Sequence, residues 1–131
     1  MILKRVTPVD LQDHWKGVVP YLTQIVDLYE GRESMNTVAE ALALGNKGLM
    51  VVEDDDEVRA VVLTEILEHP TGLRTCHVSF AGKGVDDWLH FEKEVAEFAG
   101  EFGCSRLEAQ IRPGLQKKFA HWSRGGTCIR S

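Results

Sequence analysis

The sequence predicts a single α/β domain with a mixed, mostly antiparallel central sheet and helices on both faces. Three observations lead to this prediction. Strand-like and helix-like segments follow one another along 131 residues in the order β-α-α-β-β-β-α-β-α-β. Three successive strands are joined by short turns, which indicates an antiparallel meander. A long helix then separates the last of these strands from another one, and such a crossover predicts a parallel pair.

Size and composition are those of one domain spanning residues 1–131. The chain is 44% hydrophobic, so it can bury a core without disulfides or a metal. A net charge of -5 argues against nucleic-acid and anionic-membrane partners. With no apolar run of membrane length and no signal peptide, we expect a cytoplasmic protein. The three cysteines are expected to be reduced core residues rather than a zinc site.

The N-terminal part is expected to form one strand and one interrupted helix. A strand near residues 2–6 ends before Thr7, which suits the N-cap of a helix, and Pro8 suits the first helical position. Pro20 is expected to break or restart this helix. Its apolar stripe then continues as far as Gly31.

A second helix and the meander follow. The segment Thr37-Val38-Ala39-Glu40 has the pattern of a capping box, and Gly45 is expected to end the helix. The meander strands are expected at residues 48–53, 58–67 and 73–80. The acidic run at residues 54–57 is interpreted as a solvated hairpin turn rather than a metal site.

The C-terminal part is expected to complete the crossover. A long helix from Asp86 to Gly103 carries apolar residues at helical spacing, interpreted as core: Trp88, Phe91, Val95, Phe98, Ala99 and Phe102. A strand at residues 106–111 follows. Pro113 opens a last helix, which Gly125-Gly126 ends, and residues 127–130 form a short strand.

The order of elements resembles the GNAT fold of N-acetyltransferases over nearly the whole chain. Two local patterns support it, namely residues 97–108 (EFAGEFGCSRLE) and the final helix running into Gly125-Gly126. Three shorter motifs resemble the small GNAT-like proteins of tailed phages and prophages: Asp86-Asp87-Trp88-Leu89, Gly103-Cys104 and Arg112-Pro113-Gly114.

The resemblance implies a coenzyme loop after the third meander strand. In GNAT enzymes the pyrophosphate of acetyl-CoA binds a loop of the form Arg/Gln-x-x-Gly-x-Gly/Ala, where backbone N–H groups hold the anion. Two registers compete in this chain. Residues 81–86 keep Gly84 but place Asp86 at the last small position. Residues 79–84 keep Gly82 and Gly84 and lack only the leading Arg or Gln.

Two carboxylates leave a structural alternative open. Asp86 and Asp87 can cap a helix by themselves and would compete with a phosphate for its N–H groups, although Lys83 offsets part of their charge. The segment is therefore either a tight turn before a self-capped helix or a coenzyme site. In the second case the resemblance assigns acetyl-CoA to Val78, Phe80, Gly82, Lys83, Gly84 and Val85.

Candidate catalytic residues also follow from the resemblance. GNAT enzymes attack acetyl-CoA directly with an amine and need a base and an acid. Glu65 and His77, on neighbouring strands of the meander, are the candidate bases. His121 lies near the place where the family commonly has a Tyr acid. Each of the three also fits an ordinary sheet-face or surface role.

Two classes of function remain. One is an acyl-CoA-dependent N-acetyltransferase acting on an unidentified small-molecule or protein amine, with acetyl-CoA as cofactor and no metal. The other is a non-catalytic or weakly active phage or prophage protein, located in the host cytoplasm or in a virion, with phage structural proteins or a second copy as partners. The eroded loop, the missing Tyr and Asp86-Asp87 slightly favour the second class.

One structural feature discriminates between these classes. In an enzyme, the strands on either side of the long helix should splay into a V that admits the pantetheine arm. In a non-binding relative, side chains such as Trp88 or Phe80 should fill that V.

Overall fold

A computed structural model describes residues 1–82, 90–109, 123–124 and 128–130 of the chain. In these residues seven strands form one sheet in the order β1-β2-β3-β4-β5-β7-β6. The strands are β1 (Ile2–Val6), β2 (Gly48–Asp54), β3 (Glu57–Glu68), β4 (Arg74–Gly82), β5 (Arg106–Ala109), β6 (Ser123–Arg124) and β7 (Cys128–Arg130). The helices are α1 (Leu11–Leu28), α2 (Met35–Leu44) and α4 (Glu92–Glu101).

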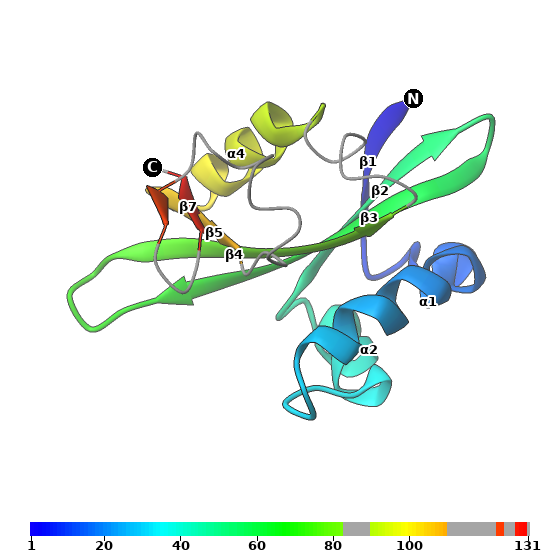
Figure 1. Ribbon diagram of the computed structural model, residues 1–131, viewed down its shortest axis with the longest axis horizontal. Coiled ribbons are helices and arrows are strands. Elements are labelled where there is room, and N and C mark those ends of the chain that lie inside the picture. The colour runs from blue at the N-terminus through cyan, green and yellow to red at the C-terminus, as the bar shows by residue number, and fades with distance from the viewer. Residues whose placement is uncertain (83–89, 110–122, 125–127, 131) are drawn as a thin grey trace.

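The sheet is mixed and is covered on both faces, as the sequence predicts. Strands β4 and β5 pair in parallel, and the other neighbours pair antiparallel. Helices α1 and α2 lie on one face and α4 on the other (Figure 1). Helix α4, which connects β4 to β5, therefore lies on the face opposite the two N-terminal helices.

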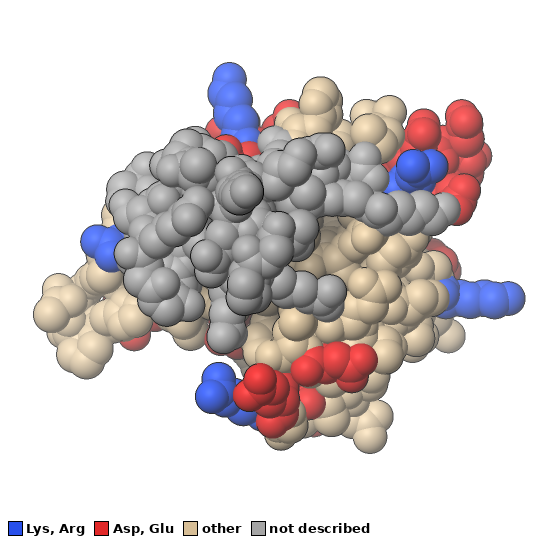
Figure 2. Space-filling view, in the orientation of Figure 1, with Lys and Arg blue, Asp and Glu red and all other residues tan. Residues whose placement is uncertain are grey.

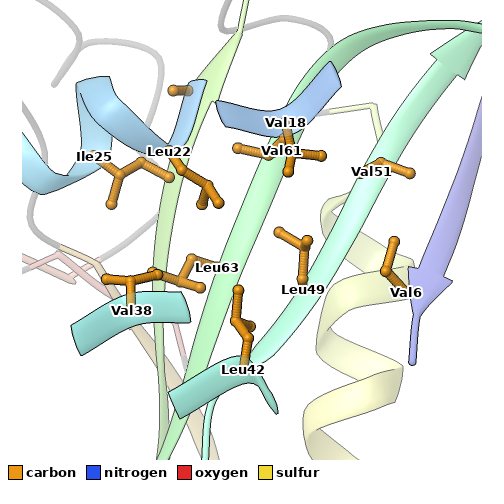
Figure 3. Close-up of a cluster of buried hydrophobic side chains, with 11 residues drawn as sticks. Val6, Val18, Leu22, Ile25, Val38, Leu42, Leu49, Val51, Val61 and Leu63 are labelled. Carbon is orange, nitrogen blue, oxygen red and sulfur yellow. The ribbon is translucent and has the colours of Figure 1, made fainter. Parts of the chain in front are cut away.

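Each face of the sheet has its own apolar core. On the α1/α2 face, buried side chains of both helices meet alternate residues of the central strands (Figure 3): Val18, Leu22, Ile25, Val38, Leu42, Leu49, Val51, Val61 and Leu63. On the α4 face, Val95 and Ala99 pack on the intervening strand residues: Met50, Val62, Cys76, Val78, Leu107 and Ala109. This division follows from the two-residue period of a strand.

Helix α1 runs through Pro20 without interruption, so the expected break there is wrong. A proline inside a helix costs about 3 kcal/mol. The helix nevertheless buries Val18, Leu22 and Ile25 completely, and each such side chain contributes about 1.5–3 kcal/mol. Burial therefore outweighs the lost backbone hydrogen bond, and Pro20 itself lies on the exposed side.

The two predicted N-caps are also corrected. Thr7 accepts a backbone hydrogen bond from Asp10 in a turn, and α1 begins only at Leu11. Helix α2 is capped by Ser34 and not by Thr37, because Ser34 Oγ accepts from the Thr37 N–H at 3.1 Å while Thr37 Oγ1 accepts from the Ser34 N–H at 2.8 Å. This earlier start lets Met35 pack against the core. Gly45 ends the helix at a φ of +79°, as predicted.

The acidic hairpin turn has the expected form. Asp55 and Asp56 adopt φ values of +51° and +64°, as a tight turn between antiparallel strands requires. Acidic side chains gather at the tip where β2 joins β3 (Figures 1 and 2). Among the described residues no group of three or more His, Cys, Asp and Glu side chains is arranged to hold a metal ion.

Strand β4 is longer than predicted and includes Gly82. Gly82 is paired with Ala60, and a Cβ on Gly82 would lie 2.6 Å from the Ala60 Cβ. The glycine is therefore required by the close approach of β3 and β4, whatever the following loop binds. Gly103, at a φ of +76°, follows the end of α4 as expected.

The C-terminal region is described in part. Residues 123–124 form β6, whereas the sequence predicted the end of a helix there, because two residues are too few to show strand alternation. Helix α4 begins only at Glu92, because His90 and Phe91 form a turn before it, so the helix expected from Asp86 starts later than predicted. Asp86 itself and residues 113–122 of the expected last helix lie outside the described residues. No helix in the described part of the chain is long and apolar enough to cross a membrane.

Candidate functional site

Ionisable side chains form a line across the α1/α2 face of the sheet. Glu65 of β3 is paired with His77 of β4, and His77 is paired with Glu108 of β5. Lys47, just before β2, contacts Glu65, and Glu33, between α1 and α2, contacts Lys47. We call these five residues the charged row. It unites segments that are far apart in the sequence, and it contains two of the predicted catalytic residues, Glu65 and His77.

Strand alternation places the row on the same face as α1. Residues two apart along a strand share a face, so Glu65 lies on the face of Leu63, which packs against the N-terminal helices. Likewise His77 shares its face with Ser79, whose Oγ lies 2.5 Å from the Tyr29 hydroxyl at the end of α1. The charged row therefore continues the α1/α2 face beyond its apolar core.

Lys47 is largely enclosed, with 8% of its side chain exposed. Its Nζ donates to Glu65 Oε2 at 2.6 Å and lies 3.6 Å from Glu33 Oε1. Burial lowers the pKa of Lys47, but the hydrogen bond to Glu65 and the attraction of Glu65 and Glu33 outweigh it and raise the pKa overall. Lys47 is therefore a fixed positive charge at neutral pH.

His77 is held in its uncharged form. Burial lowers the pKa of His77 below its ordinary value of 6.5. Among the smaller effects, the charges of Glu65 and Glu108 raise this pKa and that of Lys47 lowers it. A neutral imidazole with two carboxylates beside it can accept a proton, and the carboxylates then stabilise the imidazolium.

A hydroxyl pair lies next to His77 on the same face. Tyr29 and Ser79 are joined at 2.5 Å, and Ser79 follows His77 by two residues on β4. Local sequence patterns do not predict this contact, since it joins residues fifty positions apart. Lys47 and Glu108 were also missed, although alternation along 106–109 would have placed Glu108 on one face of its strand.

Strand β4 lies between β3 and β5. Its antiparallel pairing with β3 continues to Gly82, and in the described residues its parallel pairing with β5 runs as far as Val78, opposite Ala109. Residues 110–122, which follow Ala109, lie outside the described residues, so the splayed V stays a prediction.

The predicted coenzyme residues divide into three groups. Val78 is completely buried in the α4-face core, so only its backbone can reach a ligand. Phe80 packs against the same core, and Gly82 is the last residue of β4. The others, Lys83, Gly84 and Val85, lie outside the described residues, as do Trp88 and the candidate acid His121. Whether the V is filled therefore stays a prediction.

Comparisons with known proteins identify the fold. No protein-family model matches the sequence, and no curated protein shows significant sequence similarity to it. A ribosomal-protein-alanine N-acetyltransferase from Brucella melitensis biovar Abortus matches with a TM-score of 0.66 and 16% identity, over 95% of this chain and 97% of that one. The chain has the GNAT fold.

Two further structures with this fold agree. An aminoglycoside acetyltransferase from an uncultured soil metagenomic sample has a TM-score of 0.61 and 10% identity, covering 92% of this chain and 83% of that one. A protein described as a predicted acetyltransferase from Clostridium acetobutylicum, solved with acetyl-CoA, has a TM-score of 0.60 and 14% identity, covering 89% and 87%. At such identities the likeness establishes the fold, and the narrower resemblance to phage proteins stays a prediction.

Proposed function

We propose that this GNAT-fold protein is an acyl-CoA-dependent N-acyltransferase in which His77 is the general base. The observation that carries this proposal is the position of His77, which is paired with Glu65 of β3 on one side and with Glu108 of β5 on the other, and whose burial lowers the pKa of the imidazole. The GNAT fold supports it further. The acceptor is an amine.

Each part of the site has a defined task in this proposal. Bound acyl-CoA would supply the thioester whose acyl group forms the new C–N bond as the C–S bond breaks. His77 takes the proton that the acceptor nitrogen loses, and Glu65 and Glu108 stabilise the resulting imidazolium. The hydroxyl pair of Tyr29 and Ser79 holds a proton on the same face, from which the leaving thiolate can be protonated.

Calorimetric titration with acetyl-CoA, with CoA as the control, tests the first requirement. We expect micromolar affinity, about -8 kcal/mol. Release of CoA is then followed with a panel of small-molecule, peptide and protein amines. Binding together with amine-dependent CoA release supports the proposal, whereas binding without turnover on any acceptor class contradicts it.

The competing proposal is a non-catalytic role as a phage or prophage virion or assembly protein. Its support is in the sequence: Asp86-Asp87 beside the loop, and no Tyr at the position near His121. It predicts no heat with acetyl-CoA at millimolar concentration and co-purification with particles or a structural protein. The same titration therefore separates the two proposals.

A further inference from the structure

The chain encloses a lysine among carboxylates beside the candidate base. Lys47 lies just before β2, and its partners come from two other places: Glu33 from the connection between α1 and α2, and Glu65 from β3. Only 8% of the Lys47 side chain is exposed, compared with 50% for Lys4, which also lies near a carboxylate. Removing an ammonium group from water costs free energy unless charged partners are held in place beside it. The enclosure of Lys47 therefore depends on these two carboxylates.

The contact with Glu65 links Lys47 to His77. Glu65 is directly opposite His77 across β3 and β4, and paired side chains in this arrangement are neighbours. The Lys47 ammonium holds Glu65 Oε2 at 2.6 Å, which fixes the direction of the carboxylate on the face that His77 shares. Without Lys47, the two carboxylates beside His77, those of Glu65 and Glu108, would have no ammonium group of the row to oppose them.

We propose that Lys47 is a positioning residue for His77: it anchors Glu65 beside the imidazole and balances the carboxylates of the charged row. This inference rests on the proposed function for its catalytic meaning. The effect of the Lys47 charge on the pKa of His77, however, depends only on the folded chain and is expected without coenzyme as well. Lys47 also contacts Glu33 in the connection between α1 and α2. One ammonium group therefore contacts both this connection and Glu65, the neighbour of the base.

The direction of the effect follows from the charges that face His77. Glu65 on β3 and Glu108 on β5 favour the imidazolium, and Lys47 opposes it. Tyr29 reaches the same face through Ser79. Removing the Lys47 charge leaves the two carboxylates unopposed, so the pKa of His77 should rise. A base with a higher pKa is protonated over more of the acidic range, and the acid limb of the rate profile should move to higher pH.

The experiment measures His77 directly by proton NMR titration of the histidine ring signals in the full chain. His77→Gln identifies the signal by its loss. Lys47→Met is the test variant, and Lys4→Met is the matched control, since it removes the same charge from another lysine near a carboxylate. We expect the midpoint of His77 to move upward in Lys47→Met, to stay in place in Lys4→Met, and to return toward the wild-type value in Lys47→Arg.

An unchanged His77 midpoint in Lys47→Met would overturn the proposal, and so would an equal shift in Lys4→Met. If Lys47→Met does not fold, Glu65→Gln gives a second test with the opposite sign: the midpoint should fall, and a constant midpoint would again overturn it. Where turnover is found, the acid limb of kcat should follow the NMR midpoint. Absence of turnover in the wild-type protein counts against the proposed function alone, because the titration needs neither coenzyme nor acceptor.

Discussion

Successive residues of β4 and β5 point alternately to the two faces of this strand pair, and the two faces have different environments. The α4 face carries four buried apolar side chains: Cys76, Val78, Leu107 and Ala109. The opposite face carries His77 and Glu108, which are only partly buried. Packing on one side holds the parallel strands in register, and that register brings the ionisable groups together on the other. Along this strand pair, the buried apolar side chains and the candidate catalytic side chains thus lie on opposite faces.

The largest expected effect is a loss of catalytic rate when His77, on the partly buried face, is replaced. His77→Gln should lower kcat about 10²–10⁴-fold, or about 3–5 kcal/mol in the barrier, because a positioned base supplies this factor. Its melting temperature should change little. Amine-dependent CoA release is the measurement, and His14→Gln is the control, since His14 also lies near a carboxylate, 3.6 Å from Glu53, but on α1. An equal loss of kcat in both variants would break the assignment.

The opposite behaviour is expected for the α4 face. Leu107→Ala should lower the free energy of unfolding by about 2–5 kcal/mol, since the side chain is 2% exposed and its removal leaves a cavity. Urea denaturation measures this loss. Leu44→Ala, at a position 67% exposed, should change stability by less than about 0.5 kcal/mol. A comparably small loss for Leu107→Ala would show that this face does not hold the strands together.

A smaller loss is expected at the end of β4. Gly82→Ala should cost about 1–3 kcal/mol, because the new methyl group meets Ala60 at 2.6 Å. Gly100→Ala on α4 is the matched control: its Cβ meets nothing within 4 Å, and alanine favours the helix. The double variant Ala60→Gly with Gly82→Ala should recover only part of the stability, because the Ala60 Cα and the Arg59 O also lie 3.1 Å from the new Cβ. A loss in Gly82→Ala no larger than in Gly100→Ala would show that the close approach of β3 and β4 does not require the glycine.

The smallest effect is a dependence of stability on pH. The pKa of His77 is lowered in the folded protein, so the unfolded chain binds the proton first as the pH falls. The free energy of unfolding should therefore decrease as the pH falls through about 6.5, by at most about 1.4 kcal/mol per pH unit, and this decrease should end below the folded-state pKa. Denaturation of wild type and His77→Gln between pH 7 and 5 measures it. Identical slopes would contradict the lowered pKa of His77 in the folded protein.

The sequence by itself determined the architecture of this protein. Alternation and short turns predicted the meander, and Gly45 and Gly103 correctly marked helix ends, because these signals act over a few residues. It also singled out Glu65 and His77, although it gave no reason to join them.

Tertiary structure alone decided what lies next to what. Helix α1 passes through Pro20 because the burial of distant side chains outweighs the local cost. The charged row exists because pairing between strands sets Glu65 against His77 and His77 against Glu108, and because Lys47 reaches Glu65 from before β2. Such contacts depend on register and packing between segments far apart in the chain, and local patterns of residues do not encode them.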